Sequence, residues 1–552
     1  MQGLLFLWYY RFMLQIVIGY PPIETTKGTP LLSQNRQFQY FNAPTYIYPM
    51  VPAYAATLLK DAGHKVYWMD GIAENKTLIE WEKELANVRP DYLIVETKAP
   101  VIKFHWKEIK NLKIQNPNLK IILVGDHITF NPLESFENCP VDYIVTGGDY
   151  DFVLKNLFDH ITKKTKLEGG VYWRVSDKSI KQKPAAMNKL SPALKIGNSG
   201  PASLAHNLDE LPFMDRDLTK WELYAYENGN YKYKPATYMY SGRDCWWNRC
   251  TFCVWDHTIN PRGSYRSFSP ERLFSEVKYV VDKYNVREIF DDAGTMFVGP
   301  KLKKFCELLI ESGYNKKVVY GCNMRFNALT KDFYELMKKA NFRFLLYGME
   351  SANQKTLDKL DKGIKVEDIK NGARIASQAG LEVHATVMLG YPWESYDDAK
   401  ETIRLARECF DKGYFSSMQA TVVIPYPGTP LWKECKEKGL LKTENYEEYD
   451  MRKPVMKTPM TDSQILELTQ ELYSAFFTPK FIARKIMSIR NVDDIKFFAM
   501  AAKRLIAHLM DFDKEQKRGV LNPKFWMHSI KAMGSQLFSS ANSKLPGREI
   551  KA

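Results

Sequence analysis

The feature that most constrains this fold is a strand–helix unit that repeats six times from Ala236 onward, at intervals of roughly thirty to forty residues. Helix start signals separate the strands, as at Ser269, where an N-cap residue is followed by proline and glutamate. Six such units predict an open, partial barrel of parallel strands, whose active site lies at their carboxyl ends. The expected strands are Thr237–Tyr240, Glu288–Phe290, Lys317–Cys322, Phe342–Tyr347, Glu382–Leu389 and Ser417–Ile424.

The residues before about 160 also alternate short apolar strands with helices, which predicts a Rossmann-like parallel sheet covered on both faces. Glycine-bearing loops follow the last two strands, and ligands usually bind in the loops at the carboxyl ends of such a sheet. The candidate ligand residues in these loops are Asp126, His127, Thr129, Gly147 and Gly148. The expected strands are Leu14–Ile18, Lys65–Met69, Tyr92–Glu96, Lys120–Val124 and Asp142–Val145.

A chain of 552 residues is long enough for several domains, and the fold class that we expect is α/β. Periodicity is lost between the two α/β regions, where we expect an irregular connection with a small β-hairpin around Gly170–Val175. The predicted parts are a Rossmann-like domain (13–160), the irregular connection (161–235), the partial barrel (236–445) and a basic helical C-terminal extension (446–552).

Composition excludes several classes of protein. With 45% hydrophobic and 26% charged residues, the chain is neither disordered, collagen-like nor a coiled coil. Its eight cysteines are too few for a disulfide scaffold, which predicts a reducing, cytoplasmic location. The apolar stretch from Gly3 to Gly19 is interrupted by Arg11 and predicts neither a signal peptide nor a membrane span. The sequence leaves open whether translation starts at Met1 or at Met13.

Three of the cysteines lie within nine residues, directly after the first barrel strand: Cys245, Cys250 and Cys253. Thiolates select zinc or an iron–sulfur cluster, so this loop is the candidate metal site. An odd number of close cysteines leaves one coordination position open, and catalysis needs an open position. The competing interpretation is a structural Cys3His zinc site completed by His257, which would make the protein a non-catalytic binding module.

The cysteine loop and the segments after the later strands resemble the radical S-adenosylmethionine (SAM) enzymes, and the first region resembles the cobalamin-binding domain of one large subgroup. The resemblance covers about residues 13–445. It departs from the family in one respect, because four residues rather than the usual three separate Cys245 from Cys250. The motifs that carry it, after the cysteines, are Ile289-Phe-Asp-Asp292, Asn323-Met-Arg325, Tyr347-Gly-Met-Glu-Ser351, Met388-Leu-Gly-Tyr-Pro-Trp-Glu394 and Ile424-Pro-Tyr-Pro-Gly-Thr-Pro430.

This resemblance implies a [4Fe–4S] cluster on the three cysteines, with SAM bound at the fourth iron and cleaved to a 5′-deoxyadenosyl radical. It implies that Phe252 contacts the adenine, that Arg325 pairs with the methionine carboxylate, and that Glu350 accepts from the ribose or the ammonium group. The alternatives for these three are loop packing, a salt bridge to a neighbouring acid and a buried structural acid. The remaining implied SAM contacts are Asp292, Gly348, Ser351 and Gly390.

For the first domain, the resemblance implies cobalamin, contacted by the two glycine-bearing loops. The sequence lacks the Asp-x-His-x-x-Gly motif that supplies an axial histidine in other cobalamin proteins, and members of the subgroup commonly lack it too. The alternative is a Rossmann-like domain without a cofactor, and therefore radical SAM chemistry without cobalamin.

The C-terminal segment carries much of the basic charge. Residues 480–552 contain 15 Lys or Arg and 6 Asp or Glu, which gives +9 of the net charge of +14. Basic residues beside bulky apolar ones such as Phe525 and Trp526 suit a peripheral contact with an anionic membrane through a helix at Ile495–Met510. The alternative is a helix packed onto the barrel with a solvated basic edge. No RNA-binding module accompanies this charge, so a nucleic-acid partner is not expected.

Together these features predict a cobalamin-dependent radical SAM enzyme that methylates an unactivated carbon of a small-molecule or lipid-like substrate. Radical cyclisation or carbon–carbon bond formation is the alternative reaction. A one-electron donor such as flavodoxin or ferredoxin is the implied partner. The sequence leaves open the substrate, the modified carbon, the electron donor and the oligomeric state.

Overall fold

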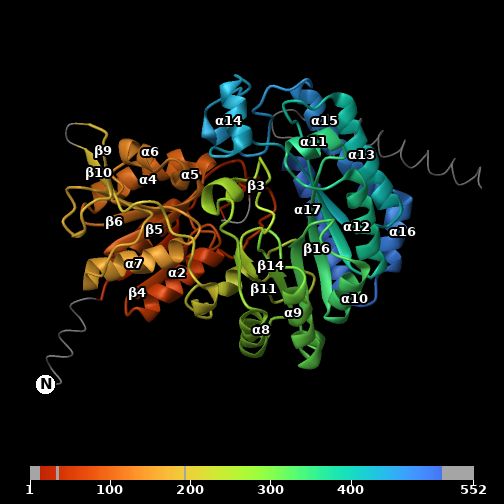
Figure 1. Cartoon of the computed structure of the whole chain (residues 1–552), viewed down its shortest axis with the longest axis horizontal. Helices are drawn as coiled ribbons and strands as arrows, with labels where there is room; N and C mark the ends of the chain where they lie inside the picture. The colour runs from red at the N-terminus through yellow and green to blue at the C-terminus, as the bar shows by residue number, and fades with distance from the viewer. Residues whose placement is uncertain (1–12, 33–36, 192–193, 512–552) are drawn as a thin grey trace, which may run out of the picture.

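The computed structural model describes residues 13–32, 37–191 and 194–511. It shows two α/β regions side by side, with the N-terminal region on the left of Figure 1 and the barrel on the right. Two sets of residues named above lie outside the described part of the chain. They are Met1, Gly3 and Arg11 at the N-terminus, and Phe525 and Trp526 in the basic tail.

The first sheet has a parallel part with strand order β4-β1-β5-β6-β7. This is the doubly wound order in which the second strand of the chain lies on one side of the first and the remaining strands on the other. It confirms the predicted Rossmann-like sheet. The strands are β1 (Gln15–Tyr20), β4 (Lys65–Asp70), β5 (Tyr92–Thr97), β6 (Lys120–Gly125) and β7 (Tyr143–Val145).

Helices cover both faces of this sheet because successive strand residues point to opposite sides. In β1, Ile16 and Ile18 join the core that contains α2 and α7, whereas Val17 joins the core that contains Trp81 of α3. The helices are α2 (Met50–Asp61), α3 (Leu78–Val88), α4 (Ile102–Gln115), α5 (Asp126–Phe130), α6 (Pro132–Asn138) and α7 (Tyr150–Lys163).

The segment expected to be an irregular connection extends the first sheet. β8 (Val171–Arg174) pairs antiparallel with β7, and β10 (Lys195–Asn198) and β9 (Ala186–Lys189) continue the sheet beyond it. The expected hairpin around Gly170–Val175 is therefore one strand of a wider antiparallel edge. Sequence periodicity missed it because these strands are only four residues long. A separate antiparallel pair, β2 (Thr29–Leu31) and β3 (Gln39–Phe41), lies before α2.

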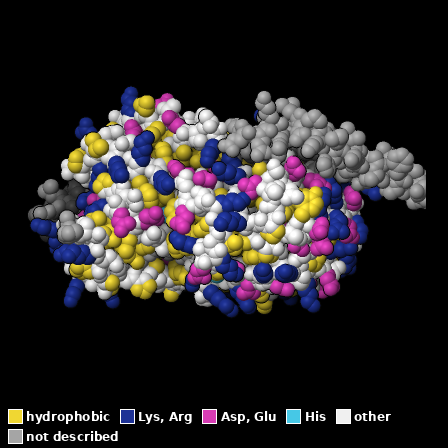
Figure 2. All heavy atoms as spheres, turned by 90° about the horizontal axis from the view of Figure 1, so that it is seen from above, with side chains coloured by type: hydrophobic (Ala, Val, Ile, Leu, Met, Phe, Trp, Pro, Cys, Tyr) yellow, Lys and Arg dark blue, Asp and Glu magenta, His cyan; other side chains and the backbone are white. Residues whose placement is uncertain are grey.

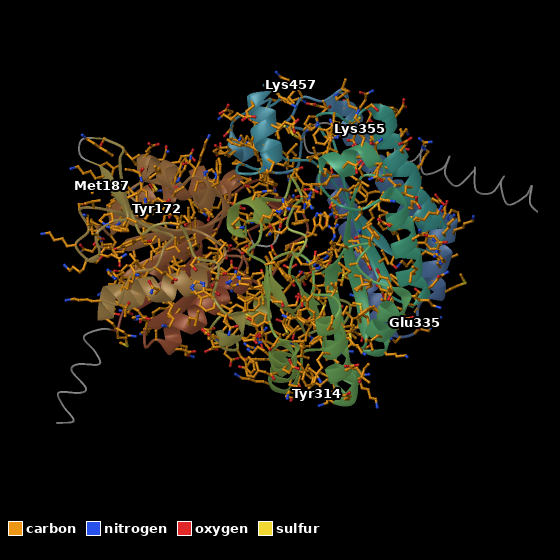
Figure 3. All side chains as sticks on the ribbon, viewed as in Figure 1. Tyr172, Met187, Tyr314, Glu335, Lys355 and Lys457 are labelled. Atoms are coloured by element: carbon orange, nitrogen blue, oxygen red, sulfur yellow. The ribbon has the colours of Figure 1, made fainter. Side chains whose placement is uncertain are left out.

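The barrel sheet has six parallel strands in chain order, as the strand–helix repeat predicted. Neighbouring strands are joined by helices on the outer side, where Tyr314, Glu335 and Lys355 lie in Figure 3. The strands are β11 (Ala236–Met239), β14 (Glu288–Asp291), β15 (Val319–Met324), β16 (Phe342–Glu350), β17 (Glu382–Leu389) and β18 (Ser417–Val422). The helices are α8 (Pro270–Tyr284), α9 (Pro300–Glu311), α10 (Lys331–Lys339), α11 (Gln354–Lys359), α12 (Val366–Gln378), α13 (Tyr396–Asp411) and α14 (Pro430–Glu437).

C-terminal helices cover the seam between the first and last barrel strands. The helices are α15 (Asp462–Tyr473), α16 (Pro479–Met487) and α17 (Val492–Asp511). At one side of the seam, the Tyr473 hydroxyl accepts from the backbone N–H of Ala420 (2.8 Å) and donates to its carbonyl (3.0 Å). At the other side, Asp494 of α17 pairs with Lys232, just before β11 (2.6 Å). The expected helix at Ile495–Met510 is therefore part of α17 and is packed against the barrel.

The surface of the described part carries mixed charge. In the face that Figure 2 shows, basic and acidic side chains are interspersed along the length of the molecule. Within residues 13–511, no helix combines the length and the hydropathy that crossing a bilayer requires.

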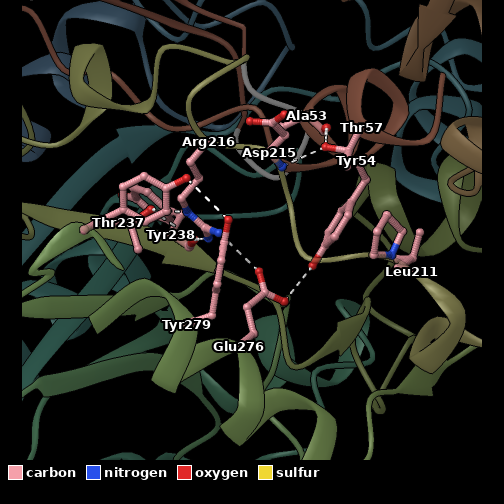
Figure 4. Close-up of polar contacts among 12 residues, drawn as sticks. Ala53, Tyr54, Thr57, Leu211, Asp215, Arg216, Thr237, Tyr238, Glu276 and Tyr279 are labelled. Atoms are coloured by element: carbon pink, nitrogen blue, oxygen red, sulfur yellow. Dashed lines mark hydrogen bonds and ion pairs between the residues drawn. The ribbon is translucent and has the colours of Figure 1, made fainter. Parts of the chain in front are cut away.

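A buried arginine joins the connection to both regions (Figure 4). The side chain of Arg216 is 0% exposed, and a buried charge is stable only when it is paired. Its guanidinium donates to Glu276 of α8 (3.4 Å) and to the carbonyl oxygen of Tyr238 (3.3 Å). Glu276 also accepts from the Tyr54 hydroxyl of α2 (3.3 Å), so one carboxylate links α2, the connection and α8.

A second polar link centres on His206 of the connection. Its Nδ1 contacts Asp149 (2.8 Å) and its Nε2 contacts Glu168 (3.0 Å), while its ring stacks on Phe152 at 4.4 Å. Carboxylates accept hydrogen bonds, so both ring nitrogens carry protons when these contacts form. The hydrogen bonds to Asp149 and Glu168 raise the pKa of His206 from 6.5 to about 9.

Stability should therefore depend on the charge of His206. Because its pKa is raised on folding, the contribution is complete below about pH 6.5 and is lost as the pH rises through 9. We expect His206→Asn to lower the free energy of unfolding by on the order of 1–3 kcal/mol at pH 6.5 and by much less at pH 10. Urea titrations of both proteins at the two pH values measure this difference. An equal loss at both pH values would contradict the assignment.

Candidate metal centre and active site

The cysteine loop begins where the first barrel strand ends. After β11, the two-residue strand β12 (Gly242–Arg243) pairs with β13 (Arg266–Ser267), and this pairing closes the segment that carries the three cysteines. A π-helical turn at Trp255–Ile259 follows Cys253. Such turns often occur at functional sites. The loop is thus anchored at both ends at the carboxyl side of the sheet, as the sequence predicted.

All three cysteines line a cavity of about 810 Å³ in the interior of the barrel. Four of the SAM contacts implied by the resemblance line the same cavity: Phe252, Arg325, Gly348 and Glu350. Its walls come from the barrel strands, from first-domain residues between Leu31 and Ile47, and from the helices α16 and α17. A volume of this size is within the range of small-molecule and cofactor sites.

Two tryptophans lie between Cys245 and Cys250, and both indole rings are held by hydrogen bonds. Trp246 donates from its indole nitrogen to the carbonyl of Met296 (3.2 Å), and Trp247 donates to the carbonyl of Asp361 (2.7 Å). The Arg325 guanidinium lies over both rings, 4.4 Å from Trp247 and 5.5 Å from Trp246. Gly363 is required here, because a Cβ at this position would lie 2.0 Å from the Trp247 ring.

Glu350 and Lys362 form an ion pair at the cavity wall (2.8 Å). β16 bulges between Gly348 and Glu350, where Glu350 takes the left-handed backbone conformation with φ 62°. The carboxylate folds back over Gly348, and a Cβ on Gly348 would lie 2.2 Å from the Glu350 oxygen and 2.5 Å from the Lys362 nitrogen. The glycine therefore leaves the space that this carboxylate occupies.

Cys250 is buried and Cys245 and Cys253 are half-buried, and two cations lie near these thiols. Burial raises the pKa of Cys250 to about 12 and raises the pKa values of Cys245 and Cys253 above their ordinary value. Lys362 and Arg325 act in the opposite direction on Cys250. Iron ions bind thiolates and displace their protons, and the two cations add further compensation for that negative charge. The donor set thus fits a cluster bound by thiolates.

The alternative zinc site depends on His257. Its Nε2 contacts the carbonyl oxygen of Cys250 at 3.1 Å, and because a carbonyl only accepts, this nitrogen donates. Among residues 13–32, 37–191 and 194–511, no three Cys, His, Asp or Glu side chains converge as the ligands of a single metal ion. The His257 ring is thus engaged with the backbone of the loop.

Three further predicted SAM contacts do not line the cavity. Asp292 is buried and contacts the Asn323 amide (3.5 Å). Ser351 contacts Thr402 (3.3 Å) and accepts from a backbone N–H. Gly390 has φ 96° and packs against α15, and its N–H donates to the buried Glu394 (2.7 Å). Their roles as SAM contacts stay predictions.

The predicted cobalamin loops lie at the interface with the barrel. Gly148 donates to the carbonyl of Ile259 (2.8 Å), and a Cβ on it would lie 2.3 Å from Asn260. Gly147 donates to Thr129 (3.1 Å), which itself donates to a backbone carbonyl. Gly148 thus contacts the turn after the cysteine loop, and none of the three residues is part of the cavity wall.

The other loop places Asp126 and His127 at the start of α5. Lys98 lies 3.4 Å from Asp126, and His127 Nε2 lies 2.9 Å from Glu134. The buried oxygen Oδ1 of Asp126 and the buried nitrogen Nδ1 of His127 have no hydrogen-bond partner among the described residues. The structure therefore leaves one polar atom of each residue available to a ligand, and the assignment of cobalamin contacts stays a prediction.

Sequence reasoning missed several residues of the cavity. Lys362 lies in the loop after α11 and belongs to no sequence motif. The glycine that follows it, Gly363, is the local sign that the chain packs closely against another segment here. Thr295 contacts the Cys245 sulfur at 3.2 Å. Asp256, whose pKa is raised to about 7 by burial and by Asp244, also lines the wall. Only the tertiary structure brings these residues beside the thiols.

The first domain holds the start of the cysteine loop. Arg243, two residues before Cys245, is buried and donates to both oxygens of Asp151 (2.8 and 2.5 Å) and to Asp149 (3.1 Å). Asp149 also accepts two hydrogen bonds from Arg266, on the paired strand β13. Two carboxylates of the first domain therefore fix both strands that close the loop, and Asp151 is a positioning residue for the cysteines.

We expect Asp151→Asn to destabilise the protein and to loosen the loop, because it leaves the Arg243 charge buried with one carboxylate fewer. Loss of one partner of a buried ion pair typically costs about 3–5 kcal/mol. Urea titration and the iron content after reconstitution measure the two effects. The control is Asp217→Asn, which removes a solvent-exposed pair with Lys283 and should cost less than about 1 kcal/mol. Equal effects of both substitutions would contradict the positioning role.

Comparison with known proteins gives three findings. Residues 239–406 match the model of the Radical SAM superfamily. The chain is 26% identical over 445 residues to an uncharacterized methyltransferase of Pyrococcus horikoshii, covering 79% of this chain and 90% of that protein. It is 24% identical over 444 residues to an anaerobic magnesium-protoporphyrin IX monomethyl ester cyclase of Cereibacter sphaeroides, covering 78% and 67%.

The fold is similar to a solved structure. The cobalamin-dependent SAM radical enzyme OxsB, with aqua-cobalamin and SAM bound, aligns with a TM-score of 0.65 and 15% identity, covering 98% of this chain and 83% of that one. At this identity the likeness shows a shared fold: a Rossmann-like sheet, a six-stranded partial barrel and C-terminal helices.

Proposed function

We propose that this protein uses cobalamin to methylate an unactivated carbon of an apolar, lipid-like substrate. The chain is a radical SAM enzyme, and its central domain carries that similarity. The observation that carries this proposal is the composition of the cavity wall. Three thiols, the Glu350–Lys362 pair and Arg325 line one cavity together with residues of the first domain. A ligand in the barrel and a ligand between the domains would therefore share one space.

The residues at the thiol end bind and orient SAM. Cys245, Cys250 and Cys253 would hold a [4Fe–4S] cluster, which would supply the electron for the reductive cleavage of SAM. Arg325, whose guanidinium lies over the rings of Trp246 and Trp247, would present a cation to the methionine carboxylate. Glu350 presents a carboxylate to the SAM ammonium or ribose. The enclosed barrel keeps water away from the reacting groups.

The proposed cobalamin site lies between the two regions. First-domain residues such as Leu31, Phe41 and Ile47 reach the cavity, and Asp126 and His127 each keep one buried polar atom that has no hydrogen-bond partner in the described part of the chain. These observations fit a large polar cofactor at the interface, where cobalamin would supply the methyl group. The relative named as a methyltransferase supports this reaction.

Radical cyclisation is the second candidate reaction, and the similarity to a cyclase of Cereibacter sphaeroides favours it. In either reaction, residues 13–160 would hold the cobalamin and residues 236–445 the cluster and SAM. Residues 161–235 would join them, and the described part of the 446–552 extension would complete the substrate cavity. A flavodoxin or ferredoxin would deliver the electron.

The first test is the metal content of protein purified anaerobically and reconstituted. We expect about four irons per chain, cobalt in a ratio near one when cobalamin is supplied, and 5′-deoxyadenosine on reduction with SAM. Cys250→Ala should abolish the iron and the SAM cleavage. The control Cys409→Ala, which removes a buried sulfur in α13, should keep both.

Other outcomes point to other functions. One zinc without iron, lost in His257→Ala, would replace the enzyme by a zinc-stabilised binding module. Iron and SAM cleavage without cobalt would leave radical SAM chemistry without cobalamin. Incorporation of the deuterated methyl group of labelled SAM into a product distinguishes methylation from cyclisation.

We propose in addition a peripheral membrane contact through the C-terminal helices. Apolar side chains of α16 and α17 are exposed to solvent, and two of them, Ile482 and Ile486, also line the cavity. Exposed apolar groups next to basic residues suit an anionic bilayer surface. The exposed residues are Ile482 (44%), Ile486 (62%), Met487 (64%), Val492 (63%) and Ile495 (54%).

We expect the protein to co-sediment with vesicles of phosphatidylglycerol and phosphatidylcholine. The double variant Met487→Glu/Ile495→Glu should bind more than about tenfold less, because each substitution removes an exposed apolar side chain that would insert into the bilayer surface. Neither residue lines the cavity. The control Ile79→Glu changes a residue of α3 that is even more exposed (77%) and should bind normally. Absence of binding by the unaltered protein would remove the proposal.

A further inference from the structure

The cavity continues from the thiols to the opposite end of the barrel. On β17 both Met388 and Glu382 line it, and they are six residues apart. A strand rises about 3.3 Å per residue, so the cavity extends about 20 Å along the strands. At its far end, Phe344, Glu382 and Ser417 come from the first residues of their strands. The space is thus elongated rather than confined to the cluster.

The wall at this end is apolar and comes largely from the C-terminal helices. Phe481 and Ile486 of α16 and Phe497, Phe498 and Ala501 of α17 line the cavity. These helices cover the seam between β18 and β11, so the C-terminal extension supplies the part of the wall that a closed barrel would take from further strands. An apolar body is the ligand chemistry that this wall favours.

Lys485 places one cation in this apolar wall. Its ammonium group lies 5.4 Å from the Phe481 ring and 5.5 Å from the Phe498 ring. No residue of the described part forms an ion pair or a hydrogen bond with it. Burial lowers its pKa, as expected of an ammonium that has lost water without gaining a partner.

The nearby carboxylate is already held by other cations. Glu382 accepts from Arg343 (2.7 Å), and its second oxygen lies 4.0 Å from Lys232. Arg343 is itself bound to Glu288, and Lys232 to Asp494 (2.6 Å). Glu382 also attracts Lys485, but no ion pair joins the two, and the direct partners of Glu382 are Arg343 and Lys232. Within the described residues Lys485 therefore forms no ion pair of its own, and its ammonium group is open to a ligand.

We propose that the far end of the cavity binds the substrate by its anionic end group, with Lys485 as the partner of that group and α16 and α17 as the wall against its apolar body. The substrate class is an elongated, mostly apolar molecule that carries one carboxylate or phosphate. Its opposite end then reaches the thiol end of the cavity, about 20 Å away. This inference rests on the proposed function, because it names the substrate class of that site.

Binding of a fluorescent probe tests this without turnover. The probe is 11-(dansylamino)undecanoic acid, and its methyl ester is the uncharged counterpart. In the full chain with its cluster, we expect the acid to bind at least about tenfold more tightly than the ester, since a charge-assisted contact gives at least this factor. Lys485→Gln should remove the difference. The control Lys480→Gln, on the same helix but outside the cavity wall, should retain it.

Two further measurements test where the probe binds and which anionic group the site prefers. Ala501→Trp fills the wall of α17 and should weaken the acid and the ester alike, whereas a probe bound elsewhere would be unaffected. Displacement by dodecanoate or by farnesyl phosphate, with dodecanol as the uncharged comparison, tells which anionic group the site prefers.

Equal binding of acid and ester, or an unchanged difference in Lys485→Gln, would overturn the inference even if the protein cleaves SAM. Conversely, a Lys485-dependent preference in a protein that holds no iron would keep the binding site and remove the radical chemistry. The two failures are therefore distinguishable.

Discussion

The structure depends on the fact that its barrel sheet has six strands and does not close. A closed barrel of eight strands fills its interior with side chains. Here β11 and β18 end the sheet, the interior holds a cavity of about 810 Å³, and the seam must be covered from elsewhere. The C-terminal helices cover it, and the Tyr473 hydroxyl satisfies the free edge of β18. Catalytic loop, substrate space and C-terminal extension therefore form one unit.

Charge compensation determines the arrangement around the thiols. Burial makes the cysteines resist ionisation, and two nearby residues supply positive charge: Arg325, which lies over the Trp247 ring, and Lys362, which pairs with Glu350. Charge is also compensated at the start of the cysteine loop, where Asp149 and Asp151 of the first domain neutralise Arg243. The first domain thus contributes to the barrel site through buried ion pairs, in addition to any cofactor that it binds.

The sequence predicted the parts that local patterns encode. The strand–helix repeat gave the six barrel strands within a few residues, and cysteine spacing with the motifs after each strand identified the loop that lines the cavity. It missed β9 and β10, whose short, polar strands carry no period-two apolar pattern. It also missed Lys362 and Thr295, which no spacing connects to the cysteines, because their proximity results from loop packing.

The basic C-terminal segment shows most clearly what the sequence determines and what the tertiary structure determines. The sequence by itself determined the strand–helix architecture, the thiol set and an amphipathic helix at the C-terminus, because each follows from local periodicity or spacing. Whether that helix faced a membrane or the barrel depended on contacts far apart in the chain, such as Lys232 with Asp494. Only the tertiary structure decided that α17 closes the barrel and that Lys485 enters its cavity, because burial of a side chain depends on which distant surfaces meet.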